Sequence, residues 1–275
     1  MTTSQLEFPI SYKVEQIDDR LDRLIPKADL LSEAIRYALL GPGKRIRPLL
    51  VLASAETFGV NPDLALDPAC AIEMVHAFSL IHDDLPCMDD DDFRRGRKSL
   101  HRAFPESIAL LAGDALLSEA FLVLARAKIG EVAKVRLIEV LGSRIGKEGM
   151  IGGQALDMHP NGSDLKSVLE MQNKKTGYLL SAALEFGPIL AGKETPWQEE
   201  MQSIGLHLGL AYQIRDDLED AEQKSDENKP TALSLLGESK ARKLLQESLG
   251  KIDAKLKNLP SGGAPISALL SPMFK

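Results

Sequence analysis

Apolar residues recur at helical spacing along almost the whole chain, and no long stretch alternates between apolar and polar residues. A period of three to four residues is typical of amphipathic α-helices, whereas half-buried strands need a period of two. Glycine and proline separate the helical segments, for example in "GPGK", "GVNPD" and "HPNGSD". The pattern predicts an all-α protein of eight to ten helices, and residues 1–275 contain no linker that would divide them into domains.

The charge balance limits the classes of partner. Of 275 residues, 44% are hydrophobic and 27% are charged, which is enough for a substantial core. The 33 basic and 40 acidic residues give a net charge of -7, which excludes a broad nucleic-acid-binding surface. Basic residues nevertheless cluster in Gly43 to Pro48, Arg94 to Lys98 and Asn173 to Gly177. These clusters indicate a small anionic ligand, although solvated helix ends explain any single one equally well.

Cysteine usage and the amino-terminal sequence indicate the compartment. The cysteines, Cys70 and Cys87, form no CxxC motif, which predicts free thiols in a reducing cytoplasm. The chain starts without a charged region followed by an apolar core, and no apolar run approaches the roughly 18 residues of a membrane span. We therefore expect a soluble cytoplasmic protein without a membrane span.

Six aspartates lie within ten residues, from Asp83 to Asp92, directly after an apolar helical segment. Like charges repel by roughly 1 kcal/mol per pair at about 4 Å in water, and the carboxyl end of a helix disfavours them further. Pro86 separates Asp83 from Asp89, so the helix must break before both can face one point. We interpret Asp90 to Asp92 as outer, solvated charges. The cluster indicates a site for a cation.

A second acidic motif, "QIRDDLED", ends another long apolar segment. On a helix, Asp216 and Asp220 share one face about 6 Å apart, with Gln213 one turn earlier. A site with only oxygen ligands favours magnesium or manganese over zinc. These metals commonly bind phosphate oxygens as well, and basic residues such as Arg94 and Arg95 can pair with the same phosphate. A single acidic motif is explained equally well by a solvated helix end. Two acidic motifs together with three basic clusters favour a diphosphate-binding site instead.

The pair His82-Asp83 also occurs in metal-dependent phosphohydrolases, which are all-α enzymes. That class needs further histidine ligands upstream, and of the five histidines only His76 precedes the pair. This alternative is therefore weak. For His76 itself, a core histidine and a ligand are equally compatible with the sequence.

Longer motifs carry a more specific signal, because several occur in order between residues 41 and 237. They are "GPGKRIRP", "EMVHAFSLIHDDLPCMDDDDFRRG", "LAGDALL", "GGQALDM", "KKTG", "QIRDDLED" and "NKPTALSLLG". Together they resemble the trans-isoprenyl diphosphate synthases, the short-chain polyprenyl synthetases, and are most similar to bacterial farnesyl diphosphate synthases. The resemblance implies an isoprenoid-synthase-type orthogonal helical bundle around a central cavity, usually in a homodimer.

The resemblance also implies roles for individual residues. An allylic diphosphate would be held through three magnesium ions, or manganese, by Asp83, Asp84, Asp89, Asp216, Asp217 and Asp220. Direct contacts to it would come from Arg94, Lys175 and Lys229. The isopentenyl diphosphate site, without metal, would consist of Gly43, Lys44, Arg47, His76 and Arg95. The catalytic set would be Asp83, Asp89, Arg94, Lys175, Thr176, Gln213 and Asp216.

The implied reaction is ionisation, condensation and elimination. Basic residues and magnesium stabilise the departing pyrophosphate, and the dipoles of Thr176 and Gln213 stabilise the allylic cation. The double bond of isopentenyl diphosphate attacks that cation, and the released pyrophosphate takes up the proton. No side-chain base is required, which agrees with the lack of a catalytic triad in the sequence.

Product length depends on the depth of the cavity. Phe78 precedes Asp83 by five residues, roughly 7 Å along a helix, where its ring can form the cavity floor next to Ser79. An ordinary core phenylalanine explains this position equally well. The resemblance implies an aromatic residue here in farnesyl synthases, so we predict a fifteen-carbon product, with geranyl and geranylgeranyl diphosphate as alternatives.

Two departures from the family pattern concern closure of the site. The loop after Asp220 is short, so Lys224 and Lys229 must share one role, and the last residues are fewer than in the usual closing helix.

Two alternative functions share the fold. A terpene cyclase is one of them, but it does not need "GPGKRIRP". A non-catalytic partner subunit typically lacks an aspartate motif, and here both are present.

Overall fold

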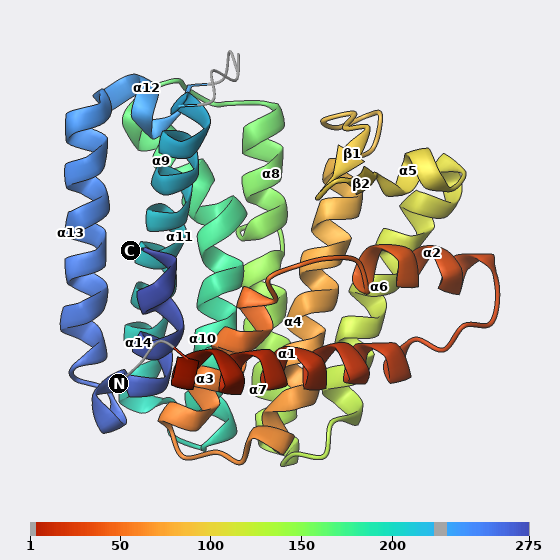
Figure 1. The fold of residues 1–275 in the computed structure, drawn as a ribbon, viewed down its shortest axis with the longest axis horizontal. Helices are drawn as coiled ribbons and strands as arrows, with labels where there is room; N and C mark the ends of the chain where they lie inside the picture. The colour runs from red at the N-terminus through yellow and green to blue at the C-terminus, as the bar shows by residue number, and fades with distance from the viewer. Residues whose placement is uncertain (1–3, 223–229, 275) are drawn as a thin grey trace.

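The computed structural model describes residues 4–222 and 230–274, and these residues are almost entirely helical (Figure 1). The longer helices are α1 (Ser4–Leu24), α2 (Leu30–Leu39), α3 (Ile46–Thr57), α4 (Pro62–Asp83), α6 (Glu106–Arg126), α7 (Glu131–Ile145), α8 (Met150–Met158), α9 (Leu165–Gln172), α10 (Tyr178–Leu190), α11 (Glu194–Glu222) and α13 (Glu238–Leu256). The short ones are α5 (Leu100–Ala103), α12 (Ala232–Leu236) and α14 (Ala264–Leu270). The all-α prediction is confirmed, but the described ranges hold fourteen α-helices, more than the eight to ten expected, and three of them have seven residues or fewer.

Three kinds of short element join the helices. A π-helical turn (Asn173–Gly177) lies between α9 and α10, and turns of 3-10 helix cover Pro260–Gly263 and Ser271–Met273. The strands β1 (Phe93–Arg94) and β2 (Arg97–Lys98) form an antiparallel hairpin directly after the first aspartate cluster. The sequence analysis did not predict this hairpin, because each strand is too short to show a period of two.

Helix α4 lies at the centre of the bundle, between α6 on one side and α8 and α10 on the other (Figure 1). Its residues are buried around the whole circumference, as expected of a core helix that is apolar on every face. The side chain of Asn61 caps its first turn, Pro62 occupies the first helical position, and the helix ends at Asp83. The prediction that the acids emerge at the carboxyl end of a buried helix is confirmed.

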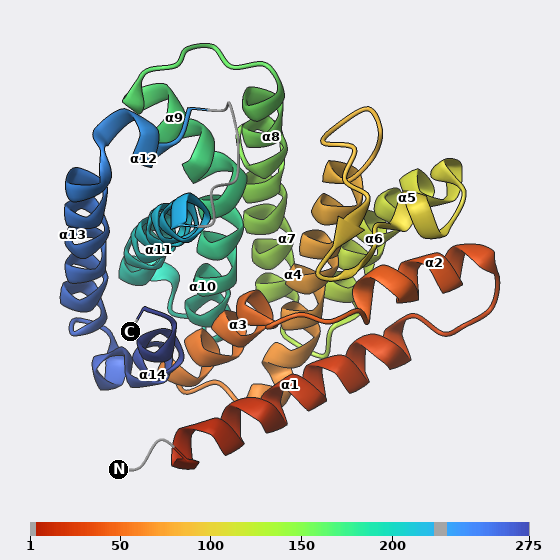
Figure 2. The ribbon, with the colours of Figure 1, turned by 45° about the horizontal axis from the view of Figure 1, so that its top comes forward.

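Helix α11 carries the second acidic motif and packs against α10 and α13. Figure 2 views α11 nearly along its axis, with α9, α10, α12 and α13 around it. The large core includes Met201, Ile204 and Leu208 from the first half of α11, whereas Ile214, Leu218, Ala232 and Ala241 form a separate small cluster near the end of that helix. Buried apolar contacts therefore hold both helices that carry aspartate motifs.

Two helices, α4 and α6, have windows of mean hydropathy 1.5 and 2.0 and are long enough to cross a membrane. The sequence analysis expected no run of this kind. The interior helices of globular proteins pass the same test, and 72% of the window in α4 is buried inside the bundle. In α6 the buried share is 39%, so this helix keeps an uncovered apolar face.

Cys70 is buried in the core and Cys87 is exposed, and neither forms a disulfide. Burial raises the pKa of the Cys70 thiol, so that it stays protonated. The prediction of free thiols is confirmed.

Candidate active site

The first aspartate cluster starts at the end of α4 and folds back on it. The N–H of Asp89 donates to the carbonyl of Asp83 at 2.9 Å, and Asp90 takes a left-handed φ of 52°. The break predicted at Pro86 is therefore present. Burial raises the pKa of the Asp83 carboxyl to about 6, against the opposing effect of Lys175 and with a contribution from the Asp89 carboxylate. The charged form of Asp83 is therefore disfavoured at the mouth of the site, chiefly because the carboxyl is buried.

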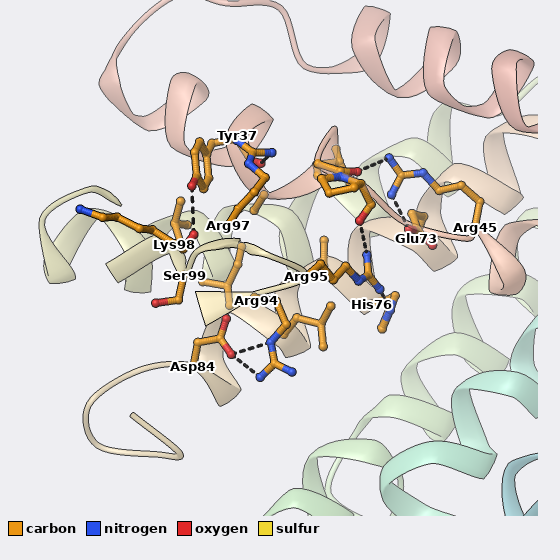
Figure 3. A pocket seen from close by; sticks show the side chains of 18 residues that line it. Tyr37, Arg45, Glu73, His76, Asp84, Arg94, Arg95, Arg97, Lys98 and Ser99 are labelled. Carbon is orange, nitrogen blue, oxygen red and sulfur yellow. Dashed lines mark hydrogen bonds and ion pairs between the residues drawn. The ribbon is translucent and has the colours of Figure 1, made fainter. Parts of the chain in front are cut away.

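Asp84, the next residue, lines a different pocket from Asp83. It is 3% exposed, and its carboxylate accepts from Nε of Arg94 at 2.8 Å and also from the terminal nitrogen of that residue (Figure 3). Arg94 also donates to Asp91 at 2.9 Å. Asp84, which the resemblance assigns to the metal, is here engaged in holding Arg94 beside the cluster.

The second motif presents Gln213 and Asp216 to a cavity of about 490 Å³. Arg215 donates to the Asp216 carboxylate at 2.7 Å, and that side chain is 48% exposed. Asp217 lies on the same helix and is partly buried. The side chain of Asp220, together with Lys224 and Lys229, lies outside the described residues, so these predicted roles stay predictions.

The cavity beside Asp216 is strongly basic. Nε2 of the buried His76 lies 3.2 Å from a terminal nitrogen of Arg47 and 3.2 Å from one of Arg95. Burial, followed by the charges of these two arginines, holds the pKa of His76 well below its usual range. The imidazole is therefore neutral and Nε2 accepts both hydrogen bonds. Within the described ranges, no carboxylate lies in salt-bridge distance of Arg47, so a bound anion would supply the missing charge.

The loop before α3 completes this cavity. Gly43 and Lys44 line it, and a Cβ on Gly43 would meet the guanidinium of Arg95 at 2.6 Å. Arg45 also lines this cavity, but its guanidinium pairs with the buried Glu73 at 2.9 Å (Figure 3). The loop therefore contributes one structural arginine next to the residues that face the ligand.

An apolar cavity of about 460 Å³ adjoins the basic one. Phe78 and Ser79 line it, and Phe78 contacts the ring of His82 edge to face at 4.9 Å between centroids. Asp83 and Lys175 line the same cavity. Both cavities share Arg47, His76 and Thr176 in their walls. An anionic group at this junction would have an apolar pocket directly beside it.

The π-helical turn supplies Lys175 and Thr176. Nζ of Lys175 donates to the carboxylate of Asp157 on α8 at 2.7 Å. The side-chain amide of Gln154, one turn before Asp157, lines the apolar cavity, and its nitrogen and oxygen are buried without a hydrogen-bond partner. Both residues belong to the motif "GGQALDM", and neither was predicted as a site residue from the sequence. Their spacing of three, which puts polar groups on one helical face, was the available signal.

His82 does not join an acidic cluster. Its Nε2 lies 3.1 Å from the carbonyl of Leu110 and 3.8 Å from the carboxylate of Asp114, both on α6. The phosphohydrolase alternative needs His82 as a metal ligand beside other histidines, and this position does not support it.

The donor set suits a hard divalent cation, although the described side chains hold no ready-made cluster of three ligands. Asp83 and Asp89 repel each other at the mouth, and their oxygens are the ligand type that magnesium prefers. Such ions commonly complete their shell with water and substrate phosphate, so sparse protein ligation fits them. The residues present therefore fit a metal that is bound together with a phosphorylated ligand.

Comparison with known proteins gives one consistent result. The family model described as "Polyprenyl synthetase" matches residues 28–242. The chain is 38% identical to a farnesyl diphosphate synthase of Geobacillus stearothermophilus over 97% of this chain and 96% of that protein. It is 42% identical to the large subunit 1 of a chloroplastic heterodimeric geranylgeranyl pyrophosphate synthase of Arabidopsis thaliana, over 80% of this chain and 62% of that protein. A crystal structure of an FPP/GFPP synthase from Zymomonas mobilis matches with a TM-score of 0.92 and 37% identity, covering 99% of this chain and 100% of that one.

Proposed function

The chain belongs to the polyprenyl synthetase family, and on this premise we propose that it condenses an allylic diphosphate with isopentenyl diphosphate to give farnesyl diphosphate. It is thus a prenyltransferase. The observation that carries the proposal is the junction of the two cavities at Arg47, His76 and Thr176. A basic pocket next to an apolar pocket suits a diphosphate whose prenyl tail continues into the second pocket.

The two substrates take different positions in this arrangement. Isopentenyl diphosphate occupies the basic cavity, where Arg47 and Arg95 lack a full set of carboxylate partners. The allylic diphosphate lies at the mouth between the aspartate motifs, and its tail enters the pocket lined by Phe78. Arg94, fixed by Asp84, and Lys175, fixed by Asp157, donate to its leaving group.

The chemistry follows from these positions. The allylic C–O bond breaks and its electron pair leaves with the diphosphate, which Arg94 and Lys175 stabilise. The π electrons of isopentenyl diphosphate then form the new C–C bond to the allylic carbon. The released diphosphate takes up the proton that is lost in forming the new double bond. The dipoles of Thr176 and Gln213 stabilise the positive carbon between these events, and the apolar walls exclude water.

Members of this family are generally metal-dependent. We propose magnesium, with three ions in the substrate complex and manganese as a substitute, held by Asp83, Asp89, Asp216 and Asp217 and, in the undescribed part, Asp220. The metal would neutralise the leaving diphosphate. Asp84 is the exception within the predicted set, because Arg94 occupies its carboxylate and it is buried, whereas Asp216, which pairs with Arg215, is 48% exposed.

The function is tested by incubating the protein with magnesium, isopentenyl diphosphate and either dimethylallyl or geranyl diphosphate, and sizing the extracted products. We expect a fifteen-carbon product that disappears when a chelator removes the metal. Hydrocarbon formation from one allylic substrate alone would identify a cyclase instead. No elongation with either primer would leave a non-catalytic partner subunit as the better description.

Phe78→Ala should shift the product spectrum to twenty carbons or more. Phe78 is 6% exposed and lies deep in the apolar cavity, so removing its ring lengthens the space for the prenyl tail. Phe186→Ala is the control, because that ring is fully buried in α10 outside the lining of the cavity. It should lower the melting temperature without changing product length. An unchanged spectrum in Phe78→Ala would remove this residue as the determinant of length.

We propose that the protein is a cytoplasmic homodimer joined through the uncovered face of α6 and α7. Leu110, Leu111 and Leu122 on α6 are 40 to 49% exposed, and Val132 and Val135 on α7 are 78% and 63% exposed. Exposed apolar side chains on two neighbouring helices are typical of an interface. Leu111→Glu should convert a dimer to a monomer in analytical ultracentrifugation, whereas Leu235→Glu on α12 should not. A monomeric wild-type protein would contradict the proposal.

A further inference from the structure

The π-helical turn between α9 and α10 is unusual, because it inserts one extra residue into what is otherwise a continuous helix. The N–H of Tyr178 bonds to the carbonyl of Asn173, five residues earlier, instead of four. Turns of this kind are rare in proteins and frequently lie at functional sites. Here the extra residue changes the direction of Lys175 and Thr176 relative to α10.

Two glycines on neighbouring helices contact the backbone of this turn. A Cβ on Gly153 of α8 would lie 2.2 Å from the backbone nitrogen of Lys175. A Cβ on Gly209 of α11 would lie 2.5 Å from Cα and 2.9 Å from the nitrogen of Gly177. Real side chains do not approach backbone atoms this closely, so an alanine at either position must displace the turn.

The turn is thus fixed on both sides next to the junction of the cavities. Gly153 touches the backbone of Lys175, and Asp157, one turn later on the same helix, binds its ammonium at 2.7 Å. Gly209 abuts the turn from α11, one turn before Gln213. Thr176, at the middle of the turn, lines both cavities.

We propose that Gly153 and Gly209 are positioning residues that fix the π-helical turn, so that Thr176 holds the allylic cation in line with the attacking double bond while Lys175 holds the leaving diphosphate. This inference rests on the proposed prenyl transfer. Displacing the turn keeps the contact of Arg94 with the leaving diphosphate, weakens that of Lys175, and misaligns the cation with the attacking double bond. Water then captures a larger share of the cations, which gives a prenyl alcohol and a proton.

The test compares Gly153→Ala and Gly209→Ala with Gly205→Ala. Gly205 lies one turn before Gly209 on α11, and its Cβ would meet Cα of Ser181 at 2.4 Å, so it imposes a similar clash on the regular part of α10. The rates of prenyl alcohol and of elongated product are measured together with the melting temperature. In the two turn variants we expect elongation to fall by about 100-fold, the usual effect of a 1 Å misplacement, and the ratio of alcohol to elongated product to rise.

Gly205→Ala should lower the melting temperature and leave this ratio at the wild-type value. An equal rise in Gly205→Ala would overturn the proposal, because a general loss of packing would then explain the effect. Thr176→Val keeps the backbone unchanged and should raise the ratio on its own. The double variant Gly153→Ala/Thr176→Val should not raise it beyond the larger single effect, whereas multiplicative effects would show that the glycine acts elsewhere.

Failure of the proposed function is distinguishable from failure of this inference. If the wild-type protein forms no new C–C bond from any primer, the function is wrong, and the glycine variants play no part in that result. A crystal structure of Gly153→Ala provides a readout besides activity. It should show the turn displaced or converted to α-helix, and an unchanged turn together with an unchanged product ratio would overturn the inference.

Discussion

Replacing Asp83 by alanine should lower the rate of prenyl transfer by roughly 10³-fold or more, the effect expected when a main stabiliser of developing charge is lost. Asp83 is the aspartate of the first cluster that ends α4, lines the apolar cavity and faces Lys175. Its carboxylate is also held close to Asp89 by the folded-back turn. Initial rates at saturating substrate and magnesium measure the effect.

Asp92→Ala is the matched control for Asp83. Its side chain is 60% exposed and pairs with Arg102 on the outer side of the cluster, so its removal should leave the rate near the wild-type value. Asp83→Asn should not lower the melting temperature of the metal-free protein, because burial and the nearby Asp89 already disfavour the charged carboxyl. A rate in Asp83→Ala equal to that of Asp92→Ala would contradict the assignment of the first motif.

The first aspartate motif shows which features of the site can be predicted from the sequence and which cannot. The break between Asp83 and Asp89 was predictable, because Pro86 cannot continue a helix and the apolar run ends there. The different directions of Asp83 and Asp84 were not. Adjacent residues at a helix end point about 100° apart, and which one faces the site depends on where Arg94 of the hairpin lies.

The same limit applies to the basic loop and to the π-helical turn. "GKRIRP" contains two arginines with similar local context, and both line the cavity, yet Arg45 is paired with Glu73, 28 residues away, while Arg47 contacts His76. The extra residue in Asn173–Gly177 leaves no mark in the periodic pattern, because one inserted residue shifts the apolar stripe only once. Both features are set by partners on other helices, which periodicity does not identify.

Arg47→Met should have opposite effects on substrate binding and on stability. The guanidinium contacts Nε2 of His76 at 3.2 Å and, among the described side chains, has no carboxylate within salt-bridge distance. Burial lowers the pKa of Arg47, because the charged guanidinium loses hydration in this site. The KM for isopentenyl diphosphate should rise by roughly 100-fold, since a charge-assisted pair with phosphate is lost. The melting temperature of the free protein should stay equal or rise.

Arg45→Met provides the contrast, because the two arginines are neighbours in sequence and differ in their partners. Arg45 is 5% exposed and pairs with Glu73, which is 3% exposed, so its removal leaves a buried carboxylate without its cation. That loss should destabilise the fold by about 3–5 kcal/mol. Thermal unfolding and the KM for each substrate, measured on both variants, separate the two roles. If Arg47→Met were as unstable as Arg45→Met, Arg47 would be a structural residue. The main evidence that the basic cavity binds a diphosphate would then be lost.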